Sequence, residues 1–310
     1  MKEKVYAAID IGSNAVRLLI KKVDDEASEL KFALKKQLLL RVPLRLGFDV
    51  FQKGEVSDKK SENLIRLMKA YKQLIRIYDV DRLRACATSA MRDAANGSEL
   101  IKKIKKECDI DIEIIPGEEE ARIVYNNHFE RAGLDDGDFL YVDVGGGSTE
   151  LNLLSSGELK ASCSFNIGTV RIITGKVKES EWARMNEFLT DIHRQNGDLN
   201  IIGSGGNINK LYKLAETKDL KNSSFSVEEL GRLYHAIEPL SMEKRMDIYN
   251  LRSDRADVII PAAEIFLNIA SLIKARRIIV PTIGVADGII DGMYLSDRSK
   301  RFRETQSEID

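Results

Sequence analysis

Residues 143 to 150 read DVGGGSTE and lie inside the longer stretch FLYVDVGGGSTELNLLSSG. Apolar residues on both sides predict two strands, and the three glycines between them predict a tight turn. Glycine allows positive φ and exposes successive backbone N–H groups, which together make a concave site for phosphate oxygens. Asp143 precedes this turn and Glu150 follows it. The stretch predicts a hairpin that binds phosphate, with a plain bulged hairpin as the alternative.

The pattern occurs a second time near the N-terminus, in VYAAIDIGSNAVRLLIKK. Aligning Asp10 with Asp143 places small residues on the glycines and Arg17 on Glu150. A loop that is used twice favours the phosphate interpretation over the plain hairpin. Asp10 and Asp143 could also hold water molecules of a bound Mg²⁺, the alternative being a local Asx turn.

The repeat predicts two domains, which also fits a chain of 310 residues. In each half we expect three strands followed by an alternation of helices and strands, with extra helices inserted in the second half. The fold class is therefore α/β: two similar lobes, each a mixed sheet of about five strands flanked by helices, with a cleft between them. The two hairpins are expected to face each other across this cleft. We expect lobe I over 1–125, joined by the C-terminal segment 296–310, and lobe II over 126–295.

Several element boundaries follow from the pattern. We expect a third strand over 29–40, a helix over 118–132, and a helix from residue 168 to about residue 195. A strand is expected over 276–282, and the closing helix begins at Gly284. Ser226 and Glu229 have the spacing of a capping box at the start of one of the inserted helices.

Composition and charge exclude several classes of protein. A formal net charge of -1 does not favour binding to nucleic acid or to an anionic membrane. The three cysteines are odd in number and widely spaced, which argues against a disulfide framework. No apolar run approaches the ~20 residues of a membrane helix, and none at the N-terminus resembles a signal peptide. We therefore expect a cytoplasmic protein.

A third turn of small residues, GSGGNINK at 203–210, follows a predicted strand and opens a helix. Free N–H groups and the helix dipole attract anions at such a position. Three such turns predict that more than one phosphate is bound.

Charged residues elsewhere leave alternatives open. Glu120 stands with two other glutamates in the first turn of a predicted helix, where acidic residues are common as helix caps. Arg92 follows the end of a strand, where it could bind a ligand or pair with Asp93. A loose basic set is either part of an anion site or a solvated strand edge; its members are Lys35, Lys36, Arg41 and Arg45.

Six motifs in this order resemble the exopolyphosphatase and guanosine pentaphosphate phosphohydrolase family, within the actin, sugar-kinase and chaperone-ATPase superfamily. They are AAIDIGSNAVRLLI, ATSAMRDAAN, IEIIPGEEEAR, VDVGGGSTEL, NIGTVRI and GSGGNINK, and the resemblance spans nearly the whole chain. The resemblance implies an actin-like ATPase (ribonuclease H-like) fold. It also implies removal of a terminal phosphate from polyphosphate or guanosine pentaphosphate by water, with Mg²⁺ or Mn²⁺, in a homodimer.

Carried over by motif, Glu120 resembles the catalytic base and Glu150 the second catalytic carboxylate at the metal. Asp143 resembles a metal ligand, and Asp10 is a further candidate. The implied phosphate contacts are Ser13, Asn14, Arg92, Gly146, Gly147, Ser148, Ser204, Gly205 and Gly206.

The chain departs from the family pattern at four positions. Ala15 stands where serine is usual and Ala262 where glycine is usual, while Ala286 and Asp287 replace an arginine–glutamate pair. The last change removes a cation near the C-terminal end of the sheet, which bears on the substrate rather than on the hydrolytic reaction. Our leading hypothesis is an exopolyphosphatase; the alternatives are a guanosine pentaphosphate phosphohydrolase, an ATP-dependent phosphotransferase and a sensor without turnover.

Overall fold

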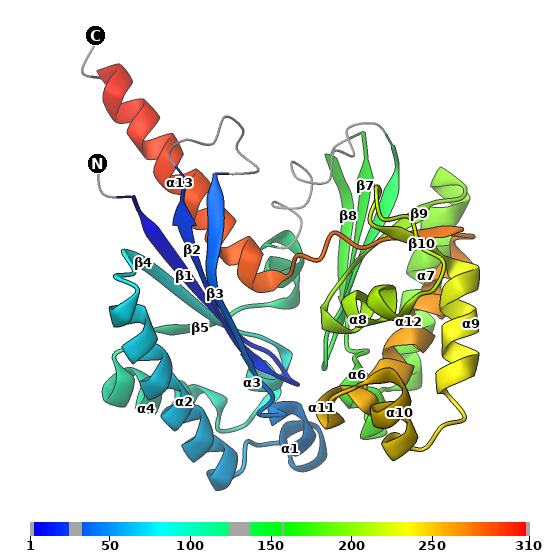
Figure 1. The fold of residues 1–310 in the computed structure, drawn as a ribbon, viewed down its shortest axis with the longest axis horizontal. Helices are drawn as coiled ribbons and strands as arrows, with labels where there is room; N and C mark the ends of the chain where they lie inside the picture. Colours follow the sequence, from blue (N-terminus) through cyan, green and yellow to red (C-terminus); the bar gives the residue numbers. More distant parts are fainter. Residues whose placement is uncertain (1–2, 25–32, 124–136, 157, 308–310) are drawn as a thin grey trace.

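A computed structural model describes residues 3–24, 33–123, 137–156 and 158–307, with the side chains of the last helix described as far as residue 299. Two α/β lobes lie side by side, each built on one mixed sheet (Figure 1). The fold class predicted from the sequence is confirmed. Nothing in the described part is a helix long and apolar enough to cross a membrane.

The first lobe has a five-stranded sheet in the order β3-β2-β1-β4-β5. The first three strands are antiparallel, whereas β4 and β5 run parallel to β1. The strands are β1 (Val5–Ile11), β2 (Val16–Val23), β3 (Leu34–Val42), β4 (Arg82–Ala87) and β5 (Ile112–Ile114). Its helices are α1 (Leu46–Lys53), α2 (Asp58–Ile77), α3 (Ser89–Asp93) and α4 (Gly97–Cys108).

The second lobe repeats this topology with one strand more, in the order β10-β11-β9-β6-β7-β8. The added strand, β10, pairs antiparallel with β11 at the edge, where the sequence pattern did not predict a strand. The strands are β6 (Phe139–Val144), β7 (Thr149–Ser155), β8 (Glu158–Phe165), β9 (Asn200–Ser204), β10 (Ser224–Ser226) and β11 (Arg277–Ile279). The helices are α6 (Thr169–Ile173), α7 (Glu179–Asn196), α8 (Gly206–Leu214), α9 (Val227–Ile237), α10 (Met242–Tyr249), α11 (Ser253–Ala256), α12 (Ile259–Leu272) and α13 (Val285–Ser307).

Some predicted boundaries were wrong. The helix expected over 168–195 is two helices, α6 and α7, because the chain turns at Gly175 with φ 65°. The strand expected over 276–282 ends at Ile279, before Pro281, which has no N–H for a ladder. The third strand starts at Leu34, and 29–32 lie outside the described residues. Of the helix predicted over 118–132, residues 117–123 are helical and the remainder is not described.

Two hydrophobic cores fill the outer sides of the two sheets, and a third joins the lobes. Side chains alternate along β1, so that Ile9 faces the first core while Tyr6 and Ala8 face the third. The third core also holds Tyr141 of β6 and Ile289 of α13. Helix α13 therefore lies between the two sheets on one side of the molecule (Figure 1).

The chain passes from β11 to α13 through residues 280–284 and so returns from the second lobe to the first. Helix α13 contacts β1, β2 and β4. The lobe boundaries at 125 and 295 stay predictions, because residue 125 lies outside the described residues and α13 already contacts the first lobe from Val285 onward.

A buried ion pair fixes the start of α13 against the first sheet. Lys21 of β2 is 2% exposed, and its Nζ lies 2.8 Å from an oxygen of Asp287 and 3.2 Å from one of Asp291. Asp287 also accepts a hydrogen bond from the Gly284 N–H. The pair therefore sets the position of the connection that precedes α13.

We expect Lys21→Ala to lower the free energy of unfolding by about 3–5 kcal/mol, because it removes the cation that pairs with the buried Asp291 and the half-buried Asp287. Urea denaturation measures the loss. Lys22→Ala is the matched control, since the neighbouring lysine is half-exposed and pairs with Glu3 at the surface; it should cost less than about 1 kcal/mol. Equal losses in both variants would contradict this role for Lys21.

The capping box predicted at Ser226 is only half formed. Ser226 Oγ accepts a hydrogen bond from the Glu229 N–H at 3.0 Å. The Glu229 carboxylate instead bonds the Arg232 guanidinium and the backbone N–H of Glu216 and Thr217. These bonds, those from Arg232 first, lower the pKa of Glu229 to about 2.

The lowered pKa predicts a pH dependence of stability. A carboxylate whose pKa is depressed on folding stabilises the protein above its unfolded pKa, and this contribution is lost as the pH falls through the folded pKa. We expect native protein to be more stable than Glu229→Gln at pH 7, and the difference to shrink between about pH 5 and pH 2. Thermal unfolding of both proteins across this range measures it; a constant difference would contradict the assignment.

Candidate active site

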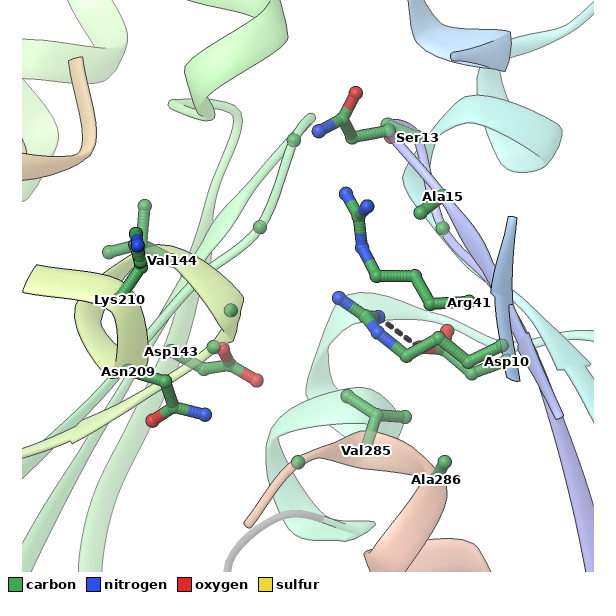
Figure 2. A pocket seen from close by; sticks show the side chains of 18 of the residues that line it. Asp10, Ser13, Ala15, Arg41, Asp143, Val144, Asn209, Lys210, Val285 and Ala286 are labelled. Carbon is green, nitrogen blue, oxygen red and sulfur yellow. Dashed lines mark hydrogen bonds and ion pairs between the residues drawn. The ribbon is translucent and has the colours of Figure 1, made fainter. Parts of the chain in front are cut away.

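A cavity of about 470 Å³ lies between the lobes. Three turns surround it: the β1–β2 turn, the β6–β7 turn and the turn between β9 and α8. The start of α13 forms a further side (Figure 2). Figure 2 shows Asp10 and Asp143 on opposite walls, with Asn209 and Lys210 beside Asp143 and Ala286 at the start of α13. The two hairpins predicted to face each other do so here.

The two hairpin turns are in direct contact. A Cβ on Gly146 would lie 3.0 Å from Ser13 Cβ, and one on Gly147 would lie 1.8 Å from Ser89 Oγ and 2.6 Å from the Phe51 ring. None of the three glycines has positive φ, so the turn does not use this freedom of glycine. At Gly146 and Gly147 the first lobe occupies the space of a side chain.

Backbone N–H groups of both turns are available to a ligand. In each turn the first glycine closes a short loop, Gly12 N–H to Ala15 O and Gly145 N–H to Ser148 O. Within the described residues, the N–H groups of Ser13, Asn14, Gly146 and Gly147 donate no hydrogen bond. Such groups on adjacent residues are the donors that bind phosphate oxygens.

The third turn contains glycine for a different reason from the triple-glycine turn. Gly205 has φ 105°, a backbone conformation that glycine adopts readily. It precedes the N-terminus of α8, whose first N–H groups have no helical partner. Gly205 and Gly206 line the cavity, but Ser204 does not. The Ser204 hydroxyl donates instead to the carbonyl of Ile283, and so holds the connection to α13.

The duplicated hairpins carry opposite charge at one position. Asp10 lies opposite Arg17 in the first ladder and Asp143 opposite Glu150 in the second. Arg17 bonds Asp10 at 2.5 Å. Asp143 has no such partner on its own hairpin, and burial raises its pKa to about 6, although Arg17 across the cleft opposes the rise.

Glu120 and Glu150 form a buried carboxylate pair beside the cavity. Glu120 is 8% exposed and Glu150 is 1% exposed. Burial raises the pKa of both carboxyl groups. The charges of Glu150, Asp10 and Asp143 add to the rise at Glu120, and that of Asp143 adds to the rise at Glu150. Ser164 Oγ donates to Glu150 at 2.9 Å, whereas one buried oxygen of Glu120 has no hydrogen-bond partner in the described structure.

The three glutamates at this helix start are placed differently. Glu120 lines the cavity, and Glu150 lies behind it without lining it. Glu119 points away and bonds Arg84 at 2.6 Å, and Glu118 lines a separate surface pocket. Capping therefore does not account for Glu120, which is turned toward the cavity.

Arg92 does not line the cavity or pair with Asp93. Its guanidinium donates to the carbonyl of Ile115 at 2.7 Å, and its charge opposes the raised pKa of Glu120 and Glu150. Arg92 therefore influences the two carboxylates through its charge. Its assignment as a phosphate contact stays a prediction.

Cations from several elements line the cavity. Arg41 reaches into it from β3 and also bonds Asp254 at 2.5 Å (Figure 2). Burial and repulsion from Arg41 and Arg17 lower the pKa of Arg255 to about 10. The other lining cations are Lys36, Lys210, Lys213 and Arg252. Of the loose basic set, Lys36 and Arg41 belong to the cavity, whereas Arg45 pairs with Asp257 and Lys35 with Asp24.

The donor set fits a divalent cation bound together with substrate. No group of three or more His, Cys, Asp or Glu side chains in the described residues is arranged as a metal site. Mg²⁺, however, is usually held by one or two carboxylates, waters and substrate phosphates. Asp143 and the unpartnered oxygen of Glu120 could supply this, while Asp10 is engaged by Arg17.

The residues that depart from the family pattern have ordinary roles here. Ala15 and Ala286 are buried and line the cavity, so they leave space where larger polar side chains are usual. Ala262 is packed in the core of the second lobe. Asp287 pairs with Lys21.

We expect Gly147→Ala to weaken binding of inorganic tripolyphosphate and to lower the free energy of unfolding by about 1–3 kcal/mol, because the added methyl group overlaps Ser89. Calorimetric titration and urea denaturation measure the two effects. Gly284→Ala is the control in the same cavity, since a Cβ there meets nothing within 4 Å. Native-like binding by Gly147→Ala would show that the contact between the turns is not needed.

Comparison with known proteins places this chain in a family. The model of the Ppx/GppA phosphatase family matches residues 34–297. A Fusobacterium nucleatum bifunctional 3-dehydroquinate synthase/phosphatase is 30% identical over 238 residues, which are 70% of this chain and 35% of that protein. A guanosine-5'-triphosphate,3'-diphosphate pyrophosphatase of Aliivibrio fischeri is 25% identical over 93% of this chain and 59% of its own length. The chain thus spans about one third to three fifths of these relatives.

Solved structures agree over both lobes. The crystal structure of the Aquifex aeolicus Ppx/GppA family member has a TM-score of 0.75 and 27% identity, covering 95% of this chain and 99% of that one. An exopolyphosphatase from Cytophaga hutchinsonii, at 23% identity and a TM-score of 0.80, has the same fold. With a family model that covers most of its length and a solved member that aligns across both lobes, the chain belongs to the Ppx/GppA phosphatase family.

Proposed function

We propose that the chain hydrolyses phosphoanhydride bonds and releases the terminal phosphate of inorganic polyphosphate. The observation that carries this proposal is the meeting, in one cavity, of two turns with unpaired N–H groups and a buried glutamate with an unpartnered oxygen. The turns supply a place for a phosphate, and the glutamate supplies a base beside it. Family membership supports the same reaction class.

The terminal phosphate would lie against the N–H groups of Ser13, Asn14, Gly146 and Gly147, with the Ser148 side of the turn next to it. The following phosphates would extend past Arg41 toward Arg255 and Lys210, because these cations line the outer part of the cavity. Gly205 and Gly206 open α8 at the same wall, where the helix N-terminus favours an anion.

The reaction requires a water molecule in line with the bond to be broken. Glu120 orients this water and accepts its proton while the water oxygen bonds the terminal phosphorus. The bridging P–O bond breaks, and the shortened chain leaves with the electron pair. In its ionised form Glu150, which accepts a hydrogen bond from Ser164, raises the pKa of Glu120 and so favours proton transfer to Glu120.

A bound Mg²⁺ or Mn²⁺ would neutralise phosphate oxygens and the carboxylates around it. Asp143 would hold it, and Asp10, Glu120 and Glu150 would add negative charge nearby. The homodimer and the cytoplasmic location expected from the sequence stay predictions, as does the absence of nucleic-acid and membrane partners.

The alternative substrate is guanosine pentaphosphate. It is favoured by similarity to the Aliivibrio fischeri guanosine-5'-triphosphate,3'-diphosphate pyrophosphatase, which extends over 93% of this chain. Orthophosphate release from polyphosphate, guanosine pentaphosphate and ATP, measured side by side, distinguishes the two. We expect polyphosphate to give the highest kcat/KM; a clear preference for guanosine pentaphosphate would support the alternative.

Glu120→Gln should reduce turnover by roughly 10²–10⁴-fold, because the amide keeps the shape of the side chain but cannot accept the proton of water. Binding of tripolyphosphate should change little. Glu119→Gln, one residue earlier, is the matched control: this glutamate bonds Arg84 outside the cavity and should be dispensable for turnover. The role of Glu120 as base is wrong if Glu120→Gln releases phosphate at the native rate.

A further inference from the structure

We infer that Arg171 is a positioning residue for the triple-glycine turn, an inference that rests on the proposed function of this turn as a phosphate site. Arg171 lies in α6 and is buried, and it does not line the cavity. Its effect on the substrate must therefore pass through the residues it contacts. The motif that contains it, NIGTVRI, has no part in the mechanism so far.

The carbonyl oxygens of all three glycines in the turn accept hydrogen bonds from residues of α6. The Thr169 N–H donates to Gly145 O at 3.1 Å, and the Val170 and Arg171 N–H groups donate to Gly146 O at 2.8 and 3.1 Å. Arg171 Nε donates to Gly147 O at 2.8 Å. Three successive peptide planes are thereby fixed by their oxygens.

Fixing an oxygen also fixes the N–H on the other side of the same peptide plane. In a trans peptide the carbonyl of one residue and the N–H of the next point in opposite directions. When α6 holds the oxygens of residues 145, 146 and 147, the N–H groups of Gly146, Gly147 and Ser148 are turned away from α6. These residues line the cavity, so their donors are set in advance for an anion.

The first hairpin shows what Arg171 replaces. There the oxygens of Ser13 and Asn14 accept from the backbone N–H groups of Gly47 and Arg45, at 2.8 and 3.0 Å. Asn14 aligns with Gly147 in the repeat. A backbone donor thus holds this oxygen in the first lobe, whereas in the second lobe the donor is a side chain and can be removed by mutation.

Arg171 also links the turn to the other lobe. Its Nη2 donates to Asp93 at the end of α3 at 2.7 Å, and its guanidinium lies 4.0 Å from the centre of the Phe51 ring of α1. Helix α3 begins at Ser89, which touches Gly147. One guanidinium therefore sets the last peptide of the turn relative to both lobes.

We expect Arg171→Ala to raise the dissociation constant for inorganic tripolyphosphate by about tenfold to hundredfold, the effect of a small displacement of positioning groups. In the steady state, KM for polyphosphate should rise more than kcat falls, because Glu120 is untouched. Arg171→Lys should recover part of the binding, since one ammonium can meet Gly147 O but not reproduce the directed pair of N–H bonds.

Asp93→Asn is the matched control, because it weakens the same link between the lobes but leaves Arg171 Nε on Gly147 O. A purely structural role predicts similar losses of stability and of binding in Arg171→Ala and Asp93→Asn. The positioning role predicts that Asp93→Asn keeps tripolyphosphate binding within about threefold of native, even when its loss of stability equals that of Arg171→Ala.

The outcomes separate this inference from the proposed function. If native protein binds tripolyphosphate and hydrolyses polyphosphate but Arg171→Ala does both equally well, only the inference is overturned. If native protein binds tripolyphosphate without releasing phosphate, hydrolysis is excluded and the binding loss in Arg171→Ala still supports the inference. If native protein does not bind tripolyphosphate, both are overturned.

Discussion

The absence of side chains where the two hairpin turns meet is the constraint on which the site depends. Gly146 and Gly147 let the second lobe approach Ser13, Ser89 and Phe51 of the first more closely than any Cβ would allow. At the other end of the cleft the lobes are joined by the apolar cluster around α13. The cavity is held between these two contacts, so that donors from both lobes lie within reach of one ligand.

The two copies of the hairpin then differ in charge, and this difference separates their roles. In the first, Arg17 neutralises Asp10, which leaves the turn and the nearby arginines to face an anion. In the second, Asp143 and Glu150 lie opposite each other, and with Glu120 they form a buried group of acids whose pKa values are raised. Such a group of carboxylates favours binding of a cation, whereas the first hairpin favours an anion. A polyphosphate bound together with a divalent cation supplies both.

The sequence predicted the parts of the site that are encoded locally. The repeat around Asp10 and Asp143 predicted two lobes and facing hairpins, because a strand–turn–strand pattern depends on neighbouring residues. The sequence could not predict why Gly147 is glycine, since the reason is contact with Ser89 of the other lobe. It left open whether Arg41 belongs to an anion site, and it missed Arg255, which enters the cavity from an element distant in sequence and carries no motif. Glu120 differs from Glu119 in the face of the helix it occupies, which becomes clear only in the structure, where Glu120 lines the cavity and Glu119 bonds Arg84.

Amide hydrogen exchange of Glu120→Gln protein, with and without inorganic tripolyphosphate, tests most directly whether the two turns form one phosphate site. Bound phosphate oxygens would protect the N–H groups of residues 13–14 and 146–147, which have no partner within the described structure. The account predicts slower exchange in both turns at the same tripolyphosphate concentration. Protection of only one turn, or of neither while tripolyphosphate is bound, would contradict it.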